Sequence, residues 1–113
     1  MVVDDAEIDR LFQALADRTR RDIVTRTMVA DHSVSSLAEH YTMSFAAVQK
    51  HVAVLERAQL ITKHRRGREQ LVRSNVATIQ RAQQLLEQLE LFWRDRIDRF
   101  TTVLDEQQTG DTP

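Results

Sequence analysis

The stretch SFAAVQKHVAVLERAQLITKHRRGREQLVRS, residues 44–74, changes character halfway. Its first half predicts a helix that begins after a Ser44 N-cap and ends at about Arg57, because apolar residues recur there at helical spacing. Those apolar positions are Val48, Val52 and Leu55. Its second half favours two strands joined at Gly67, since β-branched residues flank a central glycine. A slim helix followed at once by a basic β-hairpin therefore decides the fold.

Three helical patterns precede this stretch. Residues 4–16 carry one apolar stripe, residues 17–30 predict a helix with Asp17 as N-cap, and residues 31–41 contain a short helix that we expect Ser35 to cap. The positions expected to face inward are Ile8, Leu11, Phe12 and Leu15 in the first helix, Ile23, Val24, Thr27 and Met28 in the second, and Val34, Leu37 and Ala38 in the third. The order up to the hairpin is thus helix, helix, helix, turn, helix.

A long helix is expected after the hairpin, from about 76 to 106, with Asn75 as its cap. Its apolar residues repeat at steps of three and four at Ile79, Ala82, Leu86, Leu89, Trp93, Ile97, Phe100 and Leu104, and Leu85 and Phe92 widen the stripe. Such a stripe is larger than one small domain needs, which predicts a homodimer. We expect residues 1–107 to form one domain and residues 108–113 to be a disordered tail.

The composition indicates a small cytoplasmic protein. The chain has 113 residues, two glycines, one proline and no cysteine. The lack of cysteine excludes disulfides and thiolate metal sites, and so few glycines argue against a glycine-rich phosphate loop. Residues 1–10 carry acids where a signal peptide carries basic residues, and no apolar run is long enough to cross a membrane. We therefore expect no membrane partner.

The charge is distributed unevenly along the chain. The formal net charge is −1, but residues 44–73 hold seven Lys and Arg against two acids, a net charge of +5, which leaves −6 for the remainder. A nearly neutral protein with one basic face can still bind a polyanion, because binding responds to the local field. The alternative is a solvated basic hairpin that has no partner.

A helix–turn–helix followed by a β-hairpin is the arrangement of a winged helix–turn–helix, a mainly α fold with one hairpin. Its second helix enters the DNA major groove, and the hairpin lies along the phosphates or an adjacent minor groove. Small residues keep the outer side of the helix slim, and the hairpin supplies guanidinium groups around a tight tip. The predicted DNA-binding residues are Ser44, Phe45, Ala46, Ala47, Gln49, Lys50 and His51 on the helix, and Lys63, Arg65, Arg66, Gly67 and Arg68 on the hairpin.

Three segments resemble one family of bacterial regulators. LADRTRRDIV at 15–24 resembles its Leu-Ala-Asp-Pro-Thr-Arg-Arg signature, LAEHYTMSFAAVQKHVAVLERAQLI at 37–61 its helix–turn–helix, and RRGREQLV at 65–72 its wing. The family is the ArsR-type group of transcriptional repressors. The resemblance implies a cytoplasmic, homodimeric repressor that binds double-stranded DNA at an inverted-repeat operator, often over its own promoter. It also implies that the first and last helices form the dimer interface, through Ile8, Leu11, Phe12, Leu89, Trp93, Ile97 and Phe100.

The sequence departs from the family at positions that matter for an effector. Arg18 replaces the usual proline, and Ser33 and Ser35 fall near the positions at which metal-sensing members carry cysteines. Serine is a poor ligand for soft metals, and no histidine follows His64, so we expect neither a metal site nor a cofactor. The effector is left open between a small organic molecule, a metal at an unforeseen site, and no effector at all.

Some of these residues admit a second interpretation. Asp31 and His32 could join a metal site with a partner's residues, or form a loop or cap pair. The Trp93 region could line an effector pocket or fill a dimer interface. No nucleophile elbow or catalytic triad spacing is present, so an enzyme is not expected. The alternative function is a winged-helix protein–protein interaction module without DNA binding, which a salt titration of binding to random duplex would distinguish.

Overall fold

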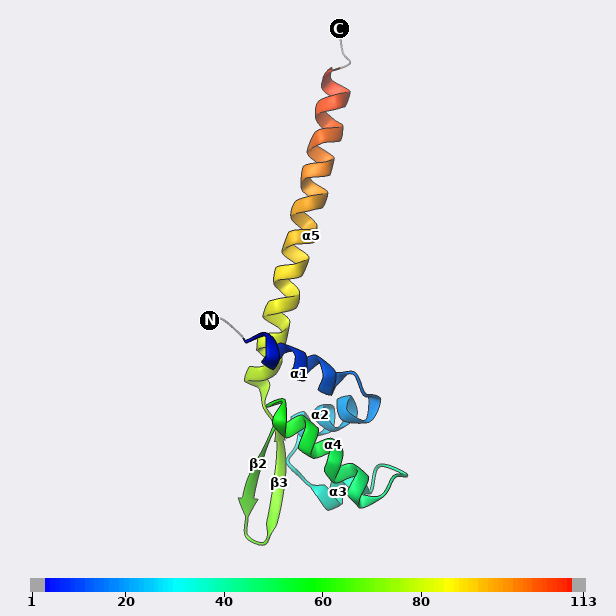
Figure 1. The fold of residues 1–113 in the computed structure, drawn as a ribbon, viewed down its shortest axis with the longest axis vertical. Coiled ribbons are helices and arrows are strands. Elements are labelled where there is room, and N and C mark those ends of the chain that lie inside the picture. Colours follow the sequence, from blue (N-terminus) through cyan, green and yellow to red (C-terminus); the bar gives the residue numbers. More distant parts are fainter. Residues whose placement is uncertain (1–3, 111–113) are drawn as a thin grey trace. The chain divides into compact units, whose positions relative to one another are not determined.

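The computed structural model describes residues 4–110, with side chains to residue 107. The elements are α1 (Asp5–Leu15), α2 (Arg18–Val29), β1 (His32–Ser33), α3 (Val34–Ala38), α4 (Phe45–Arg57), β2 (Ile61–Arg66), β3 (Glu69–Ser74) and α5 (Val76–Gly110) (Figure 1). They form two compact units, whose boundary falls after Ala82 within α5. The predicted order of four helices, a hairpin and a long helix is confirmed.

Short polar side chains cap the helices of the first unit. The Asp17 carboxylate accepts a hydrogen bond from the backbone N–H of Arg20 at 2.9 Å, and Ser44 Oγ accepts one from Ala47 at 3.1 Å, so both predicted caps are confirmed. The prediction for α3 was wrong, because Ser33 rather than Ser35 is its N-cap. Pairing of β1 with the hairpin holds Ser33 in extended backbone directly before the helix, which is the geometry that a cap requires.

The hairpin is part of a three-stranded antiparallel sheet. β2 pairs with β3 from Ile61 opposite Ser74 to Arg66 opposite Glu69, as the sequence predicted. β1, which was not predicted, adds two residues on the other side of β3, so the strand order is β1-β3-β2. Two residues are too few to show the alternation that identifies a strand in sequence.

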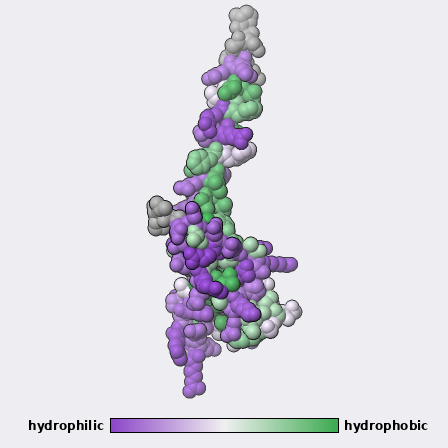
Figure 2. Space-filling model, in the orientation of Figure 1, coloured by the Kyte–Doolittle hydropathy of each residue, from purple (hydrophilic) through white to green (hydrophobic). Residues whose placement is uncertain are grey.

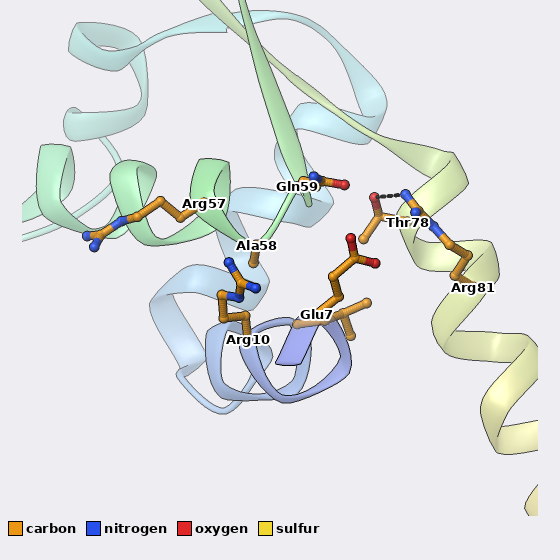
Figure 3. Close-up of a pocket in the computed structure, with 8 residues that line it drawn as sticks. Glu7, Arg10, Arg57, Ala58, Gln59, Thr78 and Arg81 are labelled. Carbon is orange, nitrogen blue, oxygen red and sulfur yellow. Dashed lines mark hydrogen bonds between the residues drawn. The ribbon is translucent and has the colours of Figure 1, made fainter. Parts of the chain in front are cut away.

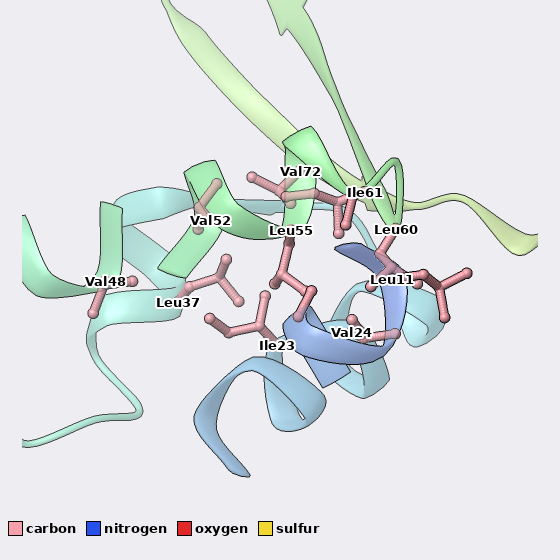
Figure 4. Close-up of a cluster of buried hydrophobic side chains, with 12 residues drawn as sticks. Leu11, Ile23, Val24, Leu37, Val48, Val52, Leu55, Leu60, Ile61 and Val72 are labelled. Carbon is pink, nitrogen blue, oxygen red and sulfur yellow. The ribbon is translucent and has the colours of Figure 1, made fainter. Parts of the chain in front are cut away.

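The core of the first unit lies between α4, α2, α3 and the base of the hairpin. The predicted inner face of α4 is confirmed, since Val48, Val52 and Leu55 are at most 1% exposed. Figure 4 shows these side chains together with the other large members of the cluster, among them Leu11, Ile23, Val24, Leu37, Leu60, Ile61 and Val72. Because α4 supplies three side chains to this cluster, its backbone is held firmly against the unit.

One predicted core position was wrong. Met28 is 50% exposed, whereas Ile23, Val24 and Thr27 of the same helix are buried. The Thr27 hydroxyl lies 2.8 Å from the Ser74 hydroxyl, which itself donates to the backbone carbonyl of Val24 at 2.7 Å. These bonds fix the face that α2 turns toward β3, and they leave the next residue outside.

The end of α4 is a left-handed turn without glycine. Gln59 has φ 61°, its N–H donates to the Glu56 carbonyl at 3.0 Å, and the N–H of Leu60 donates to the Leu55 carbonyl at 3.0 Å. This pair of bonds is the Schellman motif, which is accompanied by contact between apolar residues on either side of the turn. Leu55 and Leu60 are both fully buried, and this burial holds Gln59 in a conformation that costs an L-residue about 1–2 kcal/mol.

The second unit is the part of α5 that follows Ala82. The helix itself begins at Val76 as predicted and runs to Gly110, beyond the expected end at about 106. Its last three residues therefore include part of the predicted disordered tail, and residues 111–113 lie outside the described residues. Hydrophobic surface is visible along this helix in Figure 2. The large apolar side chains exposed on it are Leu86, Leu89, Leu91, Phe92, Trp93, Ile97, Phe100, Val103 and Leu104. Within the described part of the chain, no helix combines the length and the apolarity needed to cross a membrane.

Candidate nucleic-acid interface

The outer face of α4 consists of Phe45, Ala46, Gln49 and Lys50. All four side chains are exposed, whereas the alanines at 47 and 53 are half-buried. Residues four apart lie above one another on a helix, so Gln49 follows Phe45 and Lys50 follows Ala46 in two adjacent rows. The face is therefore narrow and carries an amide and an ammonium group, both of which can hydrogen-bond to base edges.

Three predicted helix contacts remain: Ala47 is half-buried, and Ser44 and His51 have structural roles. Ser44 Oγ accepts the capping bond at the start of α4. His51 is half-buried and faces α2, where its Nδ1 lies 3.3 Å from Arg20 Nη1 and 3.9 Å from Asp17 Oδ2. Arg20 also donates to the carbonyls of Gln13 and Ala14, at 3.0 and 2.8 Å. His51 thus ties α4 to the junction of α1 and α2.

A second tie joins α2 to the turn before α4. The Tyr41 hydroxyl donates to Asp22 Oδ2 at 2.6 Å, and Arg26 Nε donates to the same oxygen at 2.8 Å. The Tyr41 bond, followed by the Arg26 bond, lowers the pKa of Asp22, while burial and then the Asp22 bond raise the pKa of Tyr41 to about 12. At neutral pH a carboxylate therefore accepts from a neutral phenol, which holds the turn in place.

The tip of the hairpin carries the densest positive charge. We call Arg65, Arg66 and Arg68 the wing arginines. All three are exposed, and among the described residues their guanidinium groups have no ion-pair partner within 4 Å. Lys63 differs from them, because its ammonium group lies 3.6 Å from Glu56 Oε1 and its side chain is 27% exposed. The wing arginines are thus free to meet an anion.

Gly67 sets the geometry of this tip. Only Gly67 and Arg68 connect β2 to β3, and Gly67 has φ 62°. A positive φ at the first of two turn residues is the pattern of a type II′ hairpin, for which glycine is preferred. No atom lies within 4 Å of the place where a Cβ would stand, so backbone strain alone favours glycine here.

The base of the hairpin is anchored in the core. Ile61 and Val72 are 1% and 0% exposed. Arg73 binds Asp31 through two bonds, Nε to Oδ1 at 2.9 Å and Nη2 to Oδ2 at 2.7 Å, and these bonds lower the pKa of Asp31. Sequence reasoning missed this pair, because its members lie far apart in the chain and only the pairing of β1 with β3 brings them together.

The candidate metal ligands have other partners. Asp31 binds Arg73, while His32 Nδ1 lies 3.1 Å from Ser36 Oγ and its ring meets that of His40 edge-on at 6.3 Å. No group of three or more metal-ligating side chains lies together within residues 4–107. In this structure Asp31 is therefore bound to the hairpin through Arg73, and His32, in β1, is bound to α3 through Ser36.

A small cavity lies between α1, the end of α4 and the start of α5. Its volume is about 60 Å³, and Glu7, Arg10, Thr78 and Arg81 are among its lining residues (Figure 3). Arg81 Nη2 donates to Thr78 Oγ1 at 3.0 Å across one wall. Small-molecule sites usually measure several hundred Å³, so this cavity does not have room for an organic effector of ordinary size.

The predicted dimer-interface residues fall into two groups. In α1, Leu11 is 5% exposed and belongs to the core of the first unit, while Ile8 and Phe12 are half-buried. In α5, Leu89, Trp93, Ile97 and Phe100 are 44–65% exposed. At 100° per residue these four lie on one face, which we call the α5 apolar stripe, and Leu91 lies on the opposite face. Four ring-bearing or branched side chains thus meet solvent along one line.

Comparisons with known proteins are consistent over most of the chain. The HTH-type transcriptional regulator Rv2034 of Mycobacterium tuberculosis (strain ATCC 25618 / H37Rv) is 30% identical over 99 residues, 88% of this chain and 90% of the relative. The transcriptional repressor SdpR of Bacillus subtilis (strain 168) is 32% identical over 60 residues, 53% of this chain and 67% of the relative. The solved ArsR-like transcriptional regulator from Rhodococcus sp. RHA1 is 33% identical, with a TM-score of 0.79 over 87% of this chain and 92% of that chain. No protein-family model matches the chain. These relatives are regulators of transcription, not enzymes, as the sequence predicted.

Proposed function

Since the chain belongs to the ArsR family of transcriptional regulators, we propose that it is a homodimeric repressor that binds an inverted-repeat operator, including one at its own promoter. One observation carries the proposal. A helix with a slim, polar outer face is followed directly by a hairpin whose three wing arginines have no ion-pair partner among the described residues. A polyanion with an accessible groove fits both features at once, because it offers phosphates to the arginines and base edges to the helix.

The roles of the two elements differ. Gln49 can pair with adenine through N6 and N7, and Lys50 can donate to O6 and N7 of guanine. The wing arginines project from a thin support and meet phosphates, which contribute affinity but no direct sequence information. The core under α4 and the ties of His51 and Tyr41 support this division, because they fix the orientation of the helix before DNA arrives.

Dimerisation is proposed through the α5 apolar stripe. A single row of large exposed apolar side chains is costly in water, and a second copy of the same helix would cover it. Arg94 and Arg99 pair within the helix with Glu90 and Asp95, so charges border the stripe without entering it. A two-fold dimer presents two α4 helices, and its operator should therefore be an inverted repeat with half-sites about one helical turn, or a multiple of it, apart.

Repression would follow from occupancy of a promoter. The name of the similar SdpR protein supports this direction of regulation. A protein bound over the polymerase site prevents initiation without any further contact, and a site at its own promoter would limit its own amount. The DNA fragments that the protein binds would identify both the operator and the target genes.

The test is selection of bound fragments from the sheared genome of the source organism. The full-length protein is incubated with the fragments, bound DNA is sequenced, and the variant Arg65→Glu, Arg66→Glu, Arg68→Glu serves as the control. We expect enrichment of a few promoters that share one inverted repeat, and loss of retention with the variant. Retention of no DNA by a folded dimer, or equal retention by the variant, would refute DNA binding and favour a protein–protein module.

A further inference from the structure

The first residue of α4 is an unexplained feature of its outer face. Phe45 is 47% exposed, and it stands beside Ala46 in the row that continues with Gln49. The core under α4 is filled by Val48, Val52 and Leu55, so the unit does not depend on the exposed half of this ring. An aromatic side chain at the start of a helix that is proposed to enter the major groove meets a particular chemical environment there.

That environment contains one apolar group. Among the four bases only thymine presents a methyl group in the major groove, at C5, while the other positions offer hydrogen-bond donors and acceptors. A phenyl ring can pack against this methyl and gains nothing from the polar edges of the other bases. We infer that Phe45 is a specificity-determining residue, which selects a thymine in each operator half-site by contact with its C5-methyl group.

The position of this thymine follows from the helix. Phe45 and Gln49 are four residues apart, which corresponds to about 6 Å along the helix axis. A base-pair step of about 3.4 Å converts this separation to roughly two base pairs when the helix lies along the groove. The thymine should therefore stand about two base pairs from the base whose preference is lost in Gln49→Ala. The small side chains at 46 and 47 allow the close approach that a methyl contact requires.

The inference depends on the proposed function, since it needs an operator. Once bound fragments have defined the repeat, each thymine of one half-site is replaced in turn by uracil, which removes only the methyl group. Affinity is measured by fluorescence anisotropy for the full-length protein, Phe45→Ala and Phe45→Leu. Loss of one buried methyl corresponds to about a fourfold change in the dissociation constant.

The expected result is a single uracil position that weakens the wild-type protein about fourfold and leaves Phe45→Ala unchanged. Phe45→Leu should keep part of the discrimination, because it retains an apolar side chain. Val29→Ala is the matched control, since Val29 is 84% exposed on α2 and is not among the DNA-binding residues, so this variant should behave as wild type. Thermal denaturation of each variant checks that the unit is folded.

The outcomes separate the two proposals. Operator binding that no uracil substitution weakens, or a methyl preference that persists in Phe45→Ala, would overturn the assignment of Phe45 and leave the repressor proposal standing. An operator whose half-sites contain no thymine would do the same. If the wild-type protein retains no DNA in the fragment selection, the proposed function itself fails, and the inference fails with it.

Discussion

The sharpest quantitative expectation concerns the salt dependence of DNA binding. Each phosphate that a cationic side chain neutralises contributes about −0.9 to the slope of log K against log salt concentration. Three wing arginines in each of two protomers would give six contacts and a slope of about −5, equivalent to about a thousandfold weaker binding at 200 mM than at 50 mM salt. Arg66→Ala removes one contact from each protomer, so the magnitude of the slope should fall by about 1.8.

The structure also predicts a contrast within the hairpin. Lys63 already lies 3.6 Å from a Glu56 oxygen, so its charge is partly compensated before DNA binds. Lys63→Ala should therefore lower the magnitude of the slope less than Arg66→Ala does. Gln49→Ala carries no change of charge and should leave the slope unaltered, while it costs about 1–3 kcal/mol on the operator and relaxes preference at one base.

The assay is fluorescence anisotropy on operator and random duplexes over a series of salt concentrations. Arg94→Ala is the charge-matched control, because Arg94 pairs with Glu90 on α5 and is not assigned to DNA. We expect Arg66→Ala to weaken both duplexes alike, and Arg94→Ala to weaken neither. If Arg66→Ala keeps the full slope, or if it loses sequence discrimination while Gln49→Ala retains it, the assignment of phosphates to the hairpin and bases to α4 is wrong.

Three further outcomes are expected. Trp93→Asp combined with Phe100→Asp should yield monomer or unfolded chain in light scattering. Leu91→Asp, on the opposite face of α5, should leave a dimer. An intact dimer from the double variant would contradict the proposed interface. Because the native pKa of Asp31 is lowered, its contribution to stability is present above about pH 4 and is lost as pH falls through the native pKa. Asp31→Asn should therefore flatten the acid side of a plot of melting temperature against pH. An unchanged acid side would argue against a stabilising role for the bond between Asp31 and Arg73. Gln59→Gly should raise the free energy of unfolding in urea by about 1 kcal/mol, since it relieves left-handed strain, and a loss of stability would show that the turn depends on the side chain.

Local signals in the sequence were sufficient for the elements that carry the candidate site. The spacing of apolar residues in α4 predicted its buried face, because residues three or four apart lie on the same side of a helix. The caps Asp17 and Ser44 could be predicted because capping is a local interaction. Each side chain bonds a backbone N–H only three residues away. Gly67 indicated the hairpin tip because glycine adopts a positive φ at no steric cost.

Features that depend on distant partners were not predictable in this way. Ser33 became the cap of α3 only through pairing of β1 with β3, a contact between segments about forty residues apart. The bond from Tyr41 to Asp22 joins a turn to another helix, and nothing in either local pattern indicates it. Gln59 carries no sequence signal for a left-handed turn, since glycine is the residue that usually occupies this position.

The contrast between a held helix and a free hairpin tip explains why the two should contribute differently to recognition. The α4 backbone is fixed by buried side chains and by the bonds of His51 and Tyr41, so placing it in a groove requires little further ordering. Each wing arginine, in contrast, is exposed in the free protein and loses up to about 2 kcal/mol of side-chain entropy when it is immobilised. Release of condensed counterions offsets that cost at every phosphate regardless of sequence. We therefore expect discrimination between sites to come from α4, where a mismatch would leave Gln49 or Phe45 without a partner and no gain elsewhere would compensate.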